Sequence, residues 1–190
     1  AVRAHELLWT APSQLETADF RFFGALAHAA AWDAGAPDQK RRHLAAAKDH
    51  HAQLTIWATH CPVNFESRAA LAGAEIARIE ERPLDAQQLY KAAIESSHRH
   101  GFVHIEALAH EVAARFYAAR GFDKFAHTYL REARQCYAEW GAQGKVRQLE
   151  RIHSHLDNAG SAVDSTRTIR TPVDHLDLGT VIKVSQAISG

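Results

Sequence analysis

The chain has 190 residues, and its 22 acidic and 22 basic side chains give a net charge of zero. A chain without net charge or a long basic run has little electrostatic attraction for nucleic acid or an anionic membrane. The sequence has no apolar stretch of membrane-spanning length and no signal peptide. We therefore expect a soluble, cytoplasmic protein with one core or a short repeat array.

Sulfur is scarce, with two cysteines and no methionine. Cys61 and Cys136 are not part of a Cys-x-x-Cys pair, so neither a disulfide framework nor a zinc knuckle is predicted. Both are expected to be small buried residues, which is compatible with a reducing compartment. Because methionine is absent and the chain begins within a helical pattern, we expect it to be a piece of a longer protein.

The first third of the chain has the pattern of a short helix and one helical hairpin. The helix covers residues 3–9 and ends near Pro12. The hairpin has helices over residues 16–32 and 37–60, separated by Gly35 and Pro37 and ended by Pro62. The apolar residues at helical spacing in the first helix are Phe20, Phe23, Leu26, Ala27 and Ala30, and the second helix runs through Leu44, Ala47, His51, Leu54 and Trp57.

Residues 64–140 repeat at a period of forty, because residues 66–101 align with residues 106–141 without a gap. The coincident pairs are Glu66/Glu106, Ala69/Ala109, Ala74/Ala114, Ala86/Ala126, Ala93/Ala133 and Gly101/Gly141. Each unit contains two helix-length apolar patterns separated by a break, which predicts a helical hairpin. Since small residues recur where helix backbones would approach closely, we expect the units to stack and bury a shared core.

Each helix of the repeat has one expected buried face. Asn64 is expected to cap the first helix, Pro83 opens the second, and Gly73 permits close approach of another helix. The aromatic residues of the fourth helix are expected to fill a deep seam. The four faces consist of Ala69, Ala70, Gly73, Ile76 and Ala77; Ala86, Leu89, Tyr90, Ala93 and Ile94; Ile105, Leu108, Ala109, Val112, Ala113, Phe116 and Tyr117; and Phe125, Tyr129, Ala133, Cys136, Tyr137 and Trp140.

The C-terminal part changes in composition. Val146, Leu149, Ile152 and Leu156 predict one more helix, which we interpret as a cap on the repeat. Residues 157–175 are polar and aperiodic and are predicted to be a flexible linker. Residues 176–190 have the pattern of a starting helix. The expected organisation is thus a repeat domain over residues 1–156, a linker, and a helix that leads into a following domain.

The repeat resembles the tetratricopeptide (TPR) pattern. Small residues at Ala114, Ala126 and Ala133, with Tyr117 and the turn glycine Gly121, carry the resemblance. The earlier unit departs from the pattern at Ala77, where an aromatic residue is usual, and at Glu81, where glycine is usual. The period is longer than the usual thirty-four or so residues. The expected fold class is all-α, a TPR-like α-solenoid of stacked antiparallel helix pairs with a C-terminal capping helix.

Most of the chain from about residue 60 onward also resembles the helical region of very large bacterial signalling proteins. The stretches that carry this resemblance are residues 74–86, 101–109, 113–117, 129–133, 140–149 and 176–190. Such proteins combine a serine/threonine-kinase-like domain, an AAA-type ATPase, the helical array, a GAF domain and often a sensor histidine kinase. The resemblance implies that the last of these stretches leads into the GAF domain. The kinase, ATPase and GAF motifs are absent from the chain.

The 14 histidines are the unusual feature of the composition. His98, His100 and His104 do not share a regular helical face because Gly101 interrupts the spacing, so no metal site is predicted. His110 is expected to pack beside Ala109 with one hydrogen bond. His-Glu dipeptides, at His5 and His110, lack the long hairpin of a phosphoacceptor domain, and no glycine-rich phosphate loop is present. We expect no catalysis and no cofactor.

The remaining functional surface is the concave side of the predicted stack. The register set by Tyr117 assigns Glu75, Arg78, Glu111 and Arg115 to it, where they can bind a peptide or an adjacent domain. The alternative is that they are ordinary solvated charges. The functional hypothesis, which follows the resemblance, is a non-enzymatic scaffold that couples an upstream ATPase or kinase-like region to a downstream GAF and histidine-kinase region of the same multidomain sensor kinase. The alternatives are a module that docks a separate protein partner and a small-molecule sensor.

Overall fold

The computed structural model describes residues 15–153, and within that range the chain forms helices and no strand. The chain divides into two units, residues 1–152 and 153–190, so the described helices belong to the first. The expected helix over residues 3–9, the linker and the C-terminal helix lie outside the described residues. The helices are α2 (Leu15–Ala34), α3 (Pro37–His60), α4 (Pro62–Ile79), α5 (Pro83–Arg99), α6 (Val103–Ala118), α7 (Asp123–Glu139) and α8 (Gln143–Ile152).

Helix boundaries repeat with the sequence. α5 and α7 begin and end forty residues apart, and so do the starts of α6 and α8. The turns repeat as well: Arg82 N–H donates to the Ala77 carbonyl at 2.9 Å, and Phe122 N–H donates to the Tyr117 carbonyl at 3.0 Å. Each of these bonds runs from a residue in the turn to the carbonyl five residues earlier, in the last turn of the helix, as in a Schellman motif. The forty-residue period is therefore a property of the backbone.

A left-handed residue completes each of these turns. Gly101, Gly121 and Gly141 have φ angles of 73°, 77° and 83°, and Glu81 has a φ of 57°. Glycine adopts this conformation without a steric penalty, whereas a residue with a Cβ atom does not. Glu81, the departure from the repeat pattern noted in the sequence, thus follows the same backbone path at a conformational cost.

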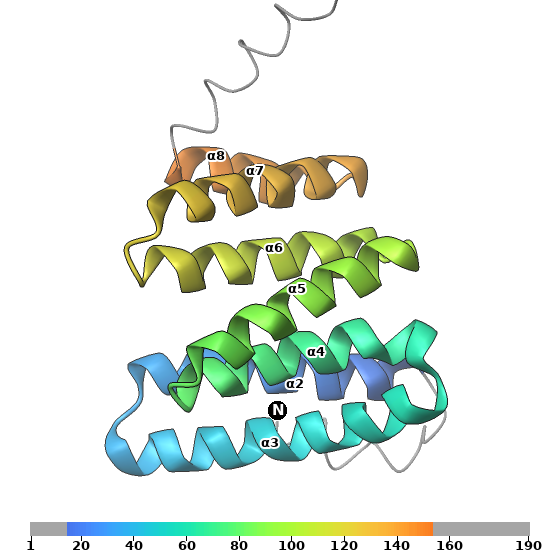
Figure 1. Ribbon diagram of the computed structural model, residues 1–190, viewed down its shortest axis with the longest axis vertical. Coiled ribbons are helices and arrows are strands. Elements are labelled where there is room, and N and C mark those ends of the chain that lie inside the picture. The colour runs from blue at the N-terminus through green and yellow to red at the C-terminus, as the bar shows by residue number, and fades with distance from the viewer. Residues whose placement is uncertain (1–14, 154–190) are drawn as a thin grey trace, which may run out of the picture. The chain divides into compact units, whose positions relative to one another are not determined.

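From α3 at the bottom of the view, α4, α5, α6 and α7 follow upward in chain order, with α2 at the height of α4 and α8 at the height of α7 (Figure 1). Each helix packs against the next, and α4 also contacts α2 and α6. Ala114, Ala126 and Ala133 are buried at these contacts, as the repeat predicted. A Cβ atom on Gly73 would lie 3.0 Å from His51 Nε2 of α3. Small residues therefore set the close approach of the helices.

Several sequence expectations need correction. α2 buries Phe22 and Ala25 rather than the predicted stripe, and Phe23 is half exposed. The buried stripe, Ala18, Phe22, Ala25 and Ala29, has the same helical spacing but smaller residues, and Phe22 and Ala25 share a core with Leu54 of α3 and Ala69 of α4. Asn64 lies inside α4, which begins with Pro62. The smaller corrections concern exposure: Cys61 is only half-buried, and Phe125 and Trp140 are 59% and 56% exposed instead of filling a deep seam.

None of the helices in residues 15–153 combines the length and the apolar character needed to cross a bilayer.

Candidate functional site

A groove runs across the C-terminal parts of α2, α4 and α6. Its volume is about 440 Å³. It brings together residues that lie more than eighty positions apart in the sequence, because α4 packs against both α2 and α6. The lining residues are Trp32 and Asp33 of α2; Glu75, Arg78 and Ile79 of α4; Glu81 of the following turn; and Val112, Arg115, Phe116, Ala119 and Arg120 of α6 and its C-terminal turn.

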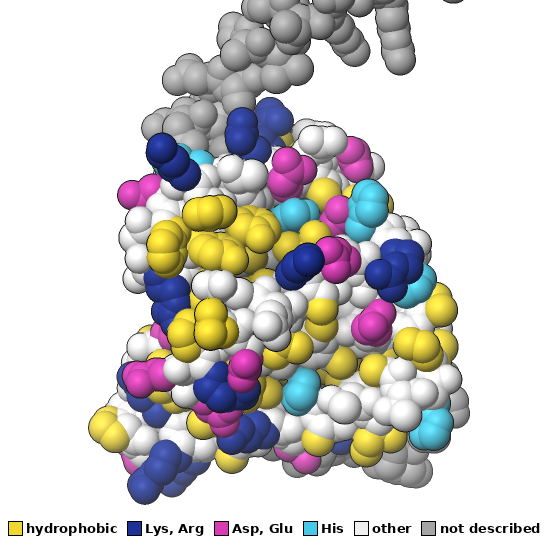
Figure 2. Space-filling model, in the orientation of Figure 1, with side chains coloured by type: hydrophobic (Ala, Val, Ile, Leu, Met, Phe, Trp, Pro, Cys, Tyr) yellow, Lys and Arg dark blue, Asp and Glu magenta, His cyan; other side chains and the backbone are white. Residues whose placement is uncertain are grey.

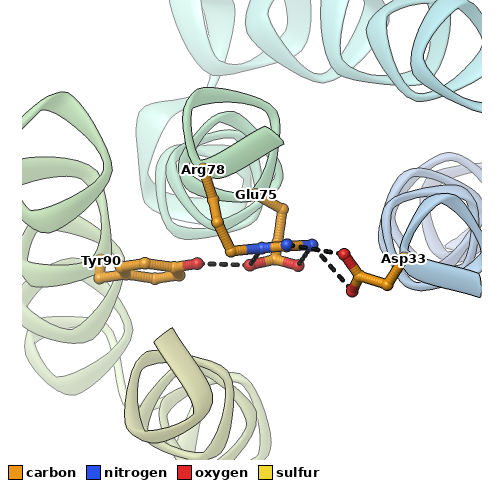
Figure 3. Close-up of polar contacts among 4 residues, drawn as sticks. All are labelled: Asp33, Glu75, Arg78 and Tyr90. Atoms are coloured by element: carbon orange, nitrogen blue, oxygen red, sulfur yellow. Dashed lines mark hydrogen bonds and ion pairs between the residues drawn. The ribbon is translucent and has the colours of Figure 1, made fainter. Parts of the chain in front are cut away.

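A polar network forms one wall of this groove (Figure 3). Arg78 Nε and Nη2 donate to the two carboxylate oxygens of Glu75 at 3.1 and 3.0 Å. Arg78 also donates to Asp33, with Nη1 2.9 Å from Oδ1. The Tyr90 hydroxyl donates to Glu75 from the other side. Since the Glu75 residue is only 7% exposed, the network supplies its carboxylate with a cation and a neutral donor. It joins α2, α4 and α5.

The ionisation of these groups follows from the pairing. Burial raises the pKa of the Tyr90 hydroxyl, and the adjacent Glu75 charge raises it further. Burial alone would lower the pKa of Arg78, but the hydrogen bonds and charges of Glu75 and Asp33 outweigh it and raise the pKa. Tyr90 therefore stays neutral and Arg78 stays charged, which fits a structural network rather than a proton-transfer site.

Two cations in the groove are free of such pairing. Arg115 and Arg120 are exposed, and neither forms an ion pair with a carboxylate of the described residues. The Arg120 guanidinium lies over the Phe116 ring, 4.3 Å from its centroid. Arg115 occupies the repeat position of Glu75, forty residues later. The groove thus combines an apolar floor with two arginines available to an anion.

Glu111 lies elsewhere. Its two carboxylate oxygens accept hydrogen bonds from the Tyr137 hydroxyl at 2.7 Å and from Lys145 Nζ at 2.9 Å. These partners belong to α7 and α8, so Glu111 ties both helices to α6. Of the four residues that the sequence assigned to the concave face, Glu75, Arg78 and Arg115 line the groove and Glu111 does not.

The histidines singled out in the sequence do not assemble as one group. His98 Nδ1 lies 3.0 Å from Glu106 Oε1, while the His104 ring packs against Trp140 with centroids 5.5 Å apart. His110 is 8% exposed, and its Nδ1 atom lacks the expected hydrogen bond. Within the described residues, the ligand atoms of Glu106, His110 and Cys136 lie within 4.8 Å of one another. Sequence reasoning missed this cluster because Cys136 comes from a different helix.

A second surface feature is aromatic. Hydrophobic side chains gather over the α6–α7 turn (Figure 2), where Phe122 and Phe125 are exposed. The Tyr117 ring stacks on the rings of Phe125 and Tyr129, with centroids 5.7 and 5.2 Å apart. The Phe125 side chain predicted for the interior is therefore part of an external aromatic stack.

Comparison of the chain with models of protein families, with curated proteins and with solved structures returns no match.

Proposed function

We propose that residues 15–152 are a non-catalytic, TPR-like scaffold in which helix pairs stack into a short α-solenoid. Its role is to couple neighbouring domains of a large cytoplasmic signalling kinase, and its groove docks an acidic segment of one of those domains or of a partner. The observation that carries the docking step is the groove across α2, α4 and α6, with its two unpaired arginines.

The stacking part of the proposal rests on backbone periodicity. Helix starts and Schellman turns recur at forty residues, and α4 contacts the alternate helices α2 and α6 as well as its neighbours. In a helical-repeat array, corresponding helices of successive units adjoin in this way and line one common surface. The pairs under this proposal are α2–α3, α4–α5 and α6–α7, with α8 as the cap.

The docking part rests on the chemistry of the groove. The Asp33–Arg78–Glu75–Tyr90 network uses its own charges internally, so it fixes one wall without offering charge to a ligand. Arg115 and Arg120 do offer charge, beside the apolar side chains of Ile79, Val112 and Phe116. This arrangement favours a segment in which a carboxylate adjoins an apolar side chain, because guanidinium groups bind carboxylates in a bidentate geometry.

Peptide selection tests the docking. Short random peptides displayed on phage are enriched on the wild-type chain and counter-selected on the double variant Arg115→Glu, Arg120→Glu. We expect the enriched peptides to contain acidic residues next to apolar ones and to lose at least about tenfold in affinity for the double variant. Arg131→Glu, an exposed arginine of α7 outside the groove, is the matched control. Equal affinity for the double variant and the control would contradict docking in the groove.

The coupling role rests on the resemblance to the helical region of large signalling kinases. It is tested in a full-length protein of that kind by deleting the equivalent of residues 15–152. We expect the deletion to uncouple kinase output from the upstream signal while the kinase domain stays active. Normal switching of kinase output after the deletion would contradict a coupling role. It would not bear on peptide docking in the groove, which the peptide selection tests separately.

A small-molecule site is the second candidate. Its support is the groove volume of about 440 Å³, which falls in the range of about 300–1,000 Å³ that ligand pockets occupy. A thermal-shift screen against a library of organic acids checks it. A hit whose stabilisation disappears in Arg115→Glu would favour this candidate over peptide docking.

A further inference from the structure

The Glu106–His110–Cys136 cluster joins α6 to α7. Glu106 and His110 lie four residues apart on α6, which places their side chains on the same face of the helix. Cys136 reaches them from α7, and all three ligand atoms lie within 4.8 Å of one another. The cluster is removed from solvent, because His110 and Cys136 are buried and Glu106 is half-buried.

Conventional pairing does not account for the His110 ring. His110 Nδ1 is buried without a hydrogen-bond partner in residues 15–153, and its Nε2 atom lies 4.0 Å from Glu106 Oε1, beyond hydrogen-bonding distance. A buried ring nitrogen without a hydrogen bond is costly. The Cys136 thiol is a weak donor and does not satisfy it.

The preceding repeat has neither histidine nor cysteine at the positions equivalent to His110 and Cys136. Forty residues earlier, the equivalent positions hold Glu66, Ala70 and Ser96. There the Ser96 hydroxyl donates to Glu66 Oε2 at 2.8 Å, and alanine occupies the position of the histidine. The second unit keeps the glutamate and replaces alanine and serine by the two side chains that bind transition metals best, imidazole and thiol.

We propose that Glu106, His110 and Cys136 form a zinc site that fastens α6 to α7. Carboxylate, imidazole and thiolate are the three kinds of protein ligand that zinc takes. In a tetrahedral site their ligand atoms stand about 3.3–3.8 Å apart, so the present spacing requires a contraction of roughly 1 Å. Three ligands from the chain leave the fourth position for water or another ligand.

His98 is the positioning residue of the site. Its Nδ1 atom lies 3.0 Å from Glu106 Oε1, and its side chain is exposed at the end of α5. A hydrogen bond from the imidazole to the ligating carboxylate fixes the orientation of that carboxylate and typically strengthens metal binding about 10- to 100-fold.

Without a metal ion, burial favours the uncharged form of both His110 and Cys136. Burial, with the nearby His98, lowers the pKa of His110 to about 4, so the imidazole is neutral at pH 7 and able to ligate. Burial, with the charges of Glu106 and other nearby glutamates, raises the pKa of Cys136 to about 12. A metal ion would therefore displace the thiol proton on binding, as it does at other thiolate sites.

Cobalt(II) titration of the untagged, reduced 190-residue chain tests the site. We expect one ion per chain, a thiolate-to-cobalt charge-transfer band, and the intense visible bands of a four-coordinate site, all removed by zinc. Cys136→Ser should abolish the charge-transfer band, whereas Cys61→Ser should retain it. His98→Gln should keep the spectrum but weaken zinc binding about tenfold.

Matched variants address the other two ligands. Glu106→Gln and His110→Gln should each weaken zinc binding at least about tenfold, whereas Glu66→Gln at the equivalent position of the first repeat should leave it unchanged. Circular dichroism establishes that each variant is folded. Absence of the charge-transfer band from the folded wild type, or its persistence in Cys136→Ser, would overturn the assignment. The outcome is independent of docking in the groove.

Discussion

The helix pairs α4–α5 and α6–α7 have the same backbone pattern but differ in the side chains at equivalent places. Their second helices have the same length, and their turns form the same hydrogen bonds. Glu75 of the first pair is buried in a network, whereas Arg115 at the same repeat position is exposed in the groove. Ser96 bonds to Glu66, whereas Cys136 lies beside Glu106 and His110.

This difference separates two kinds of position in a helical repeat. Alanine at the helix contacts and a left-handed residue at each turn recur in both units, because close packing and chain reversal permit few alternatives. Two sets of positions hold different polar groups in the two units. They are the positions that line the groove and the positions beside Glu66 and Glu106, where the two helices of each pair meet. Side-chain chemistry that is specific to one unit is found at these variable positions. Substitutions at both kinds of position should therefore differ in their effect on stability.

Arg78→Ala is expected to have the largest effect. It gives the first unit the alanine that the second unit has at residue 118, but it leaves the buried Glu75 carboxylate without its cation. We expect a loss of about 2–4 kcal/mol in the free energy of unfolding, because removing one partner strands a charge. Urea denaturation measures it. Arg115→Ala should stay within about 0.5 kcal/mol of wild type, and equal losses in the two variants would contradict the distinction between network and groove.

Exchanging the turn residues should have an intermediate effect. Glu81→Gly is expected to stabilise the fold by about 1 kcal/mol, since glycine adopts the left-handed conformation without strain. Gly121→Glu should destabilise it by a similar amount, because it introduces a Cβ atom at a φ of 77°. Thermal and urea unfolding measure both. A destabilising Glu81→Gly would mean that this glutamate contributes an interaction that outweighs its backbone strain.

The smallest effect is expected in the α2–α3 pair, which lies outside the forty-residue alignment. His28 Nδ1 and His43 Nδ1 lie 3.0 Å apart, and burial, followed by the His43 charge, lowers the pKa of His28. A lowered pKa in the folded state means that the unfolded chain gains the proton first. Stability is therefore lost as pH falls below about 6.5, the ordinary value for histidine.

Replacement of that histidine tests the pH effect. His28→Gln should lose less stability than wild type between pH 7 and pH 5 in urea denaturation, whereas His60→Gln, at an exposed site at the end of α3, should behave as wild type. A His28→Gln variant with the same pH dependence as wild type would contradict a role for the His28–His43 pair.

The sequence predicted the repeat better than the sites. Period, turns and buried alanines could be inferred because each is a local property of spacing and residue size. The buried face of α2 could not be inferred from the sequence. Phe22 and Phe23 belong to two apolar stripes with the same spacing, and packing against the neighbouring helices determines which stripe is buried. The pairing of Glu111 with Lys145 of α8 could not be inferred either. Hydrogen-bond and ion-pair partners that come from other helices cannot be inferred from the spacing of residues within one helix.

The central claim is that equivalent positions of the two units occupy equivalent places in the fold. Moving the histidine and cysteine of the second unit to the equivalent positions of the first unit tests it. Ala70→His with Ser96→Cys, beside the native Glu66, would give the first unit the Glu–His–Cys set of the second. Cobalt stoichiometry, measured on a variant shown to be folded, should rise from one to two ions per chain. A folded variant that still bound a single ion would contradict the equivalence of the two units.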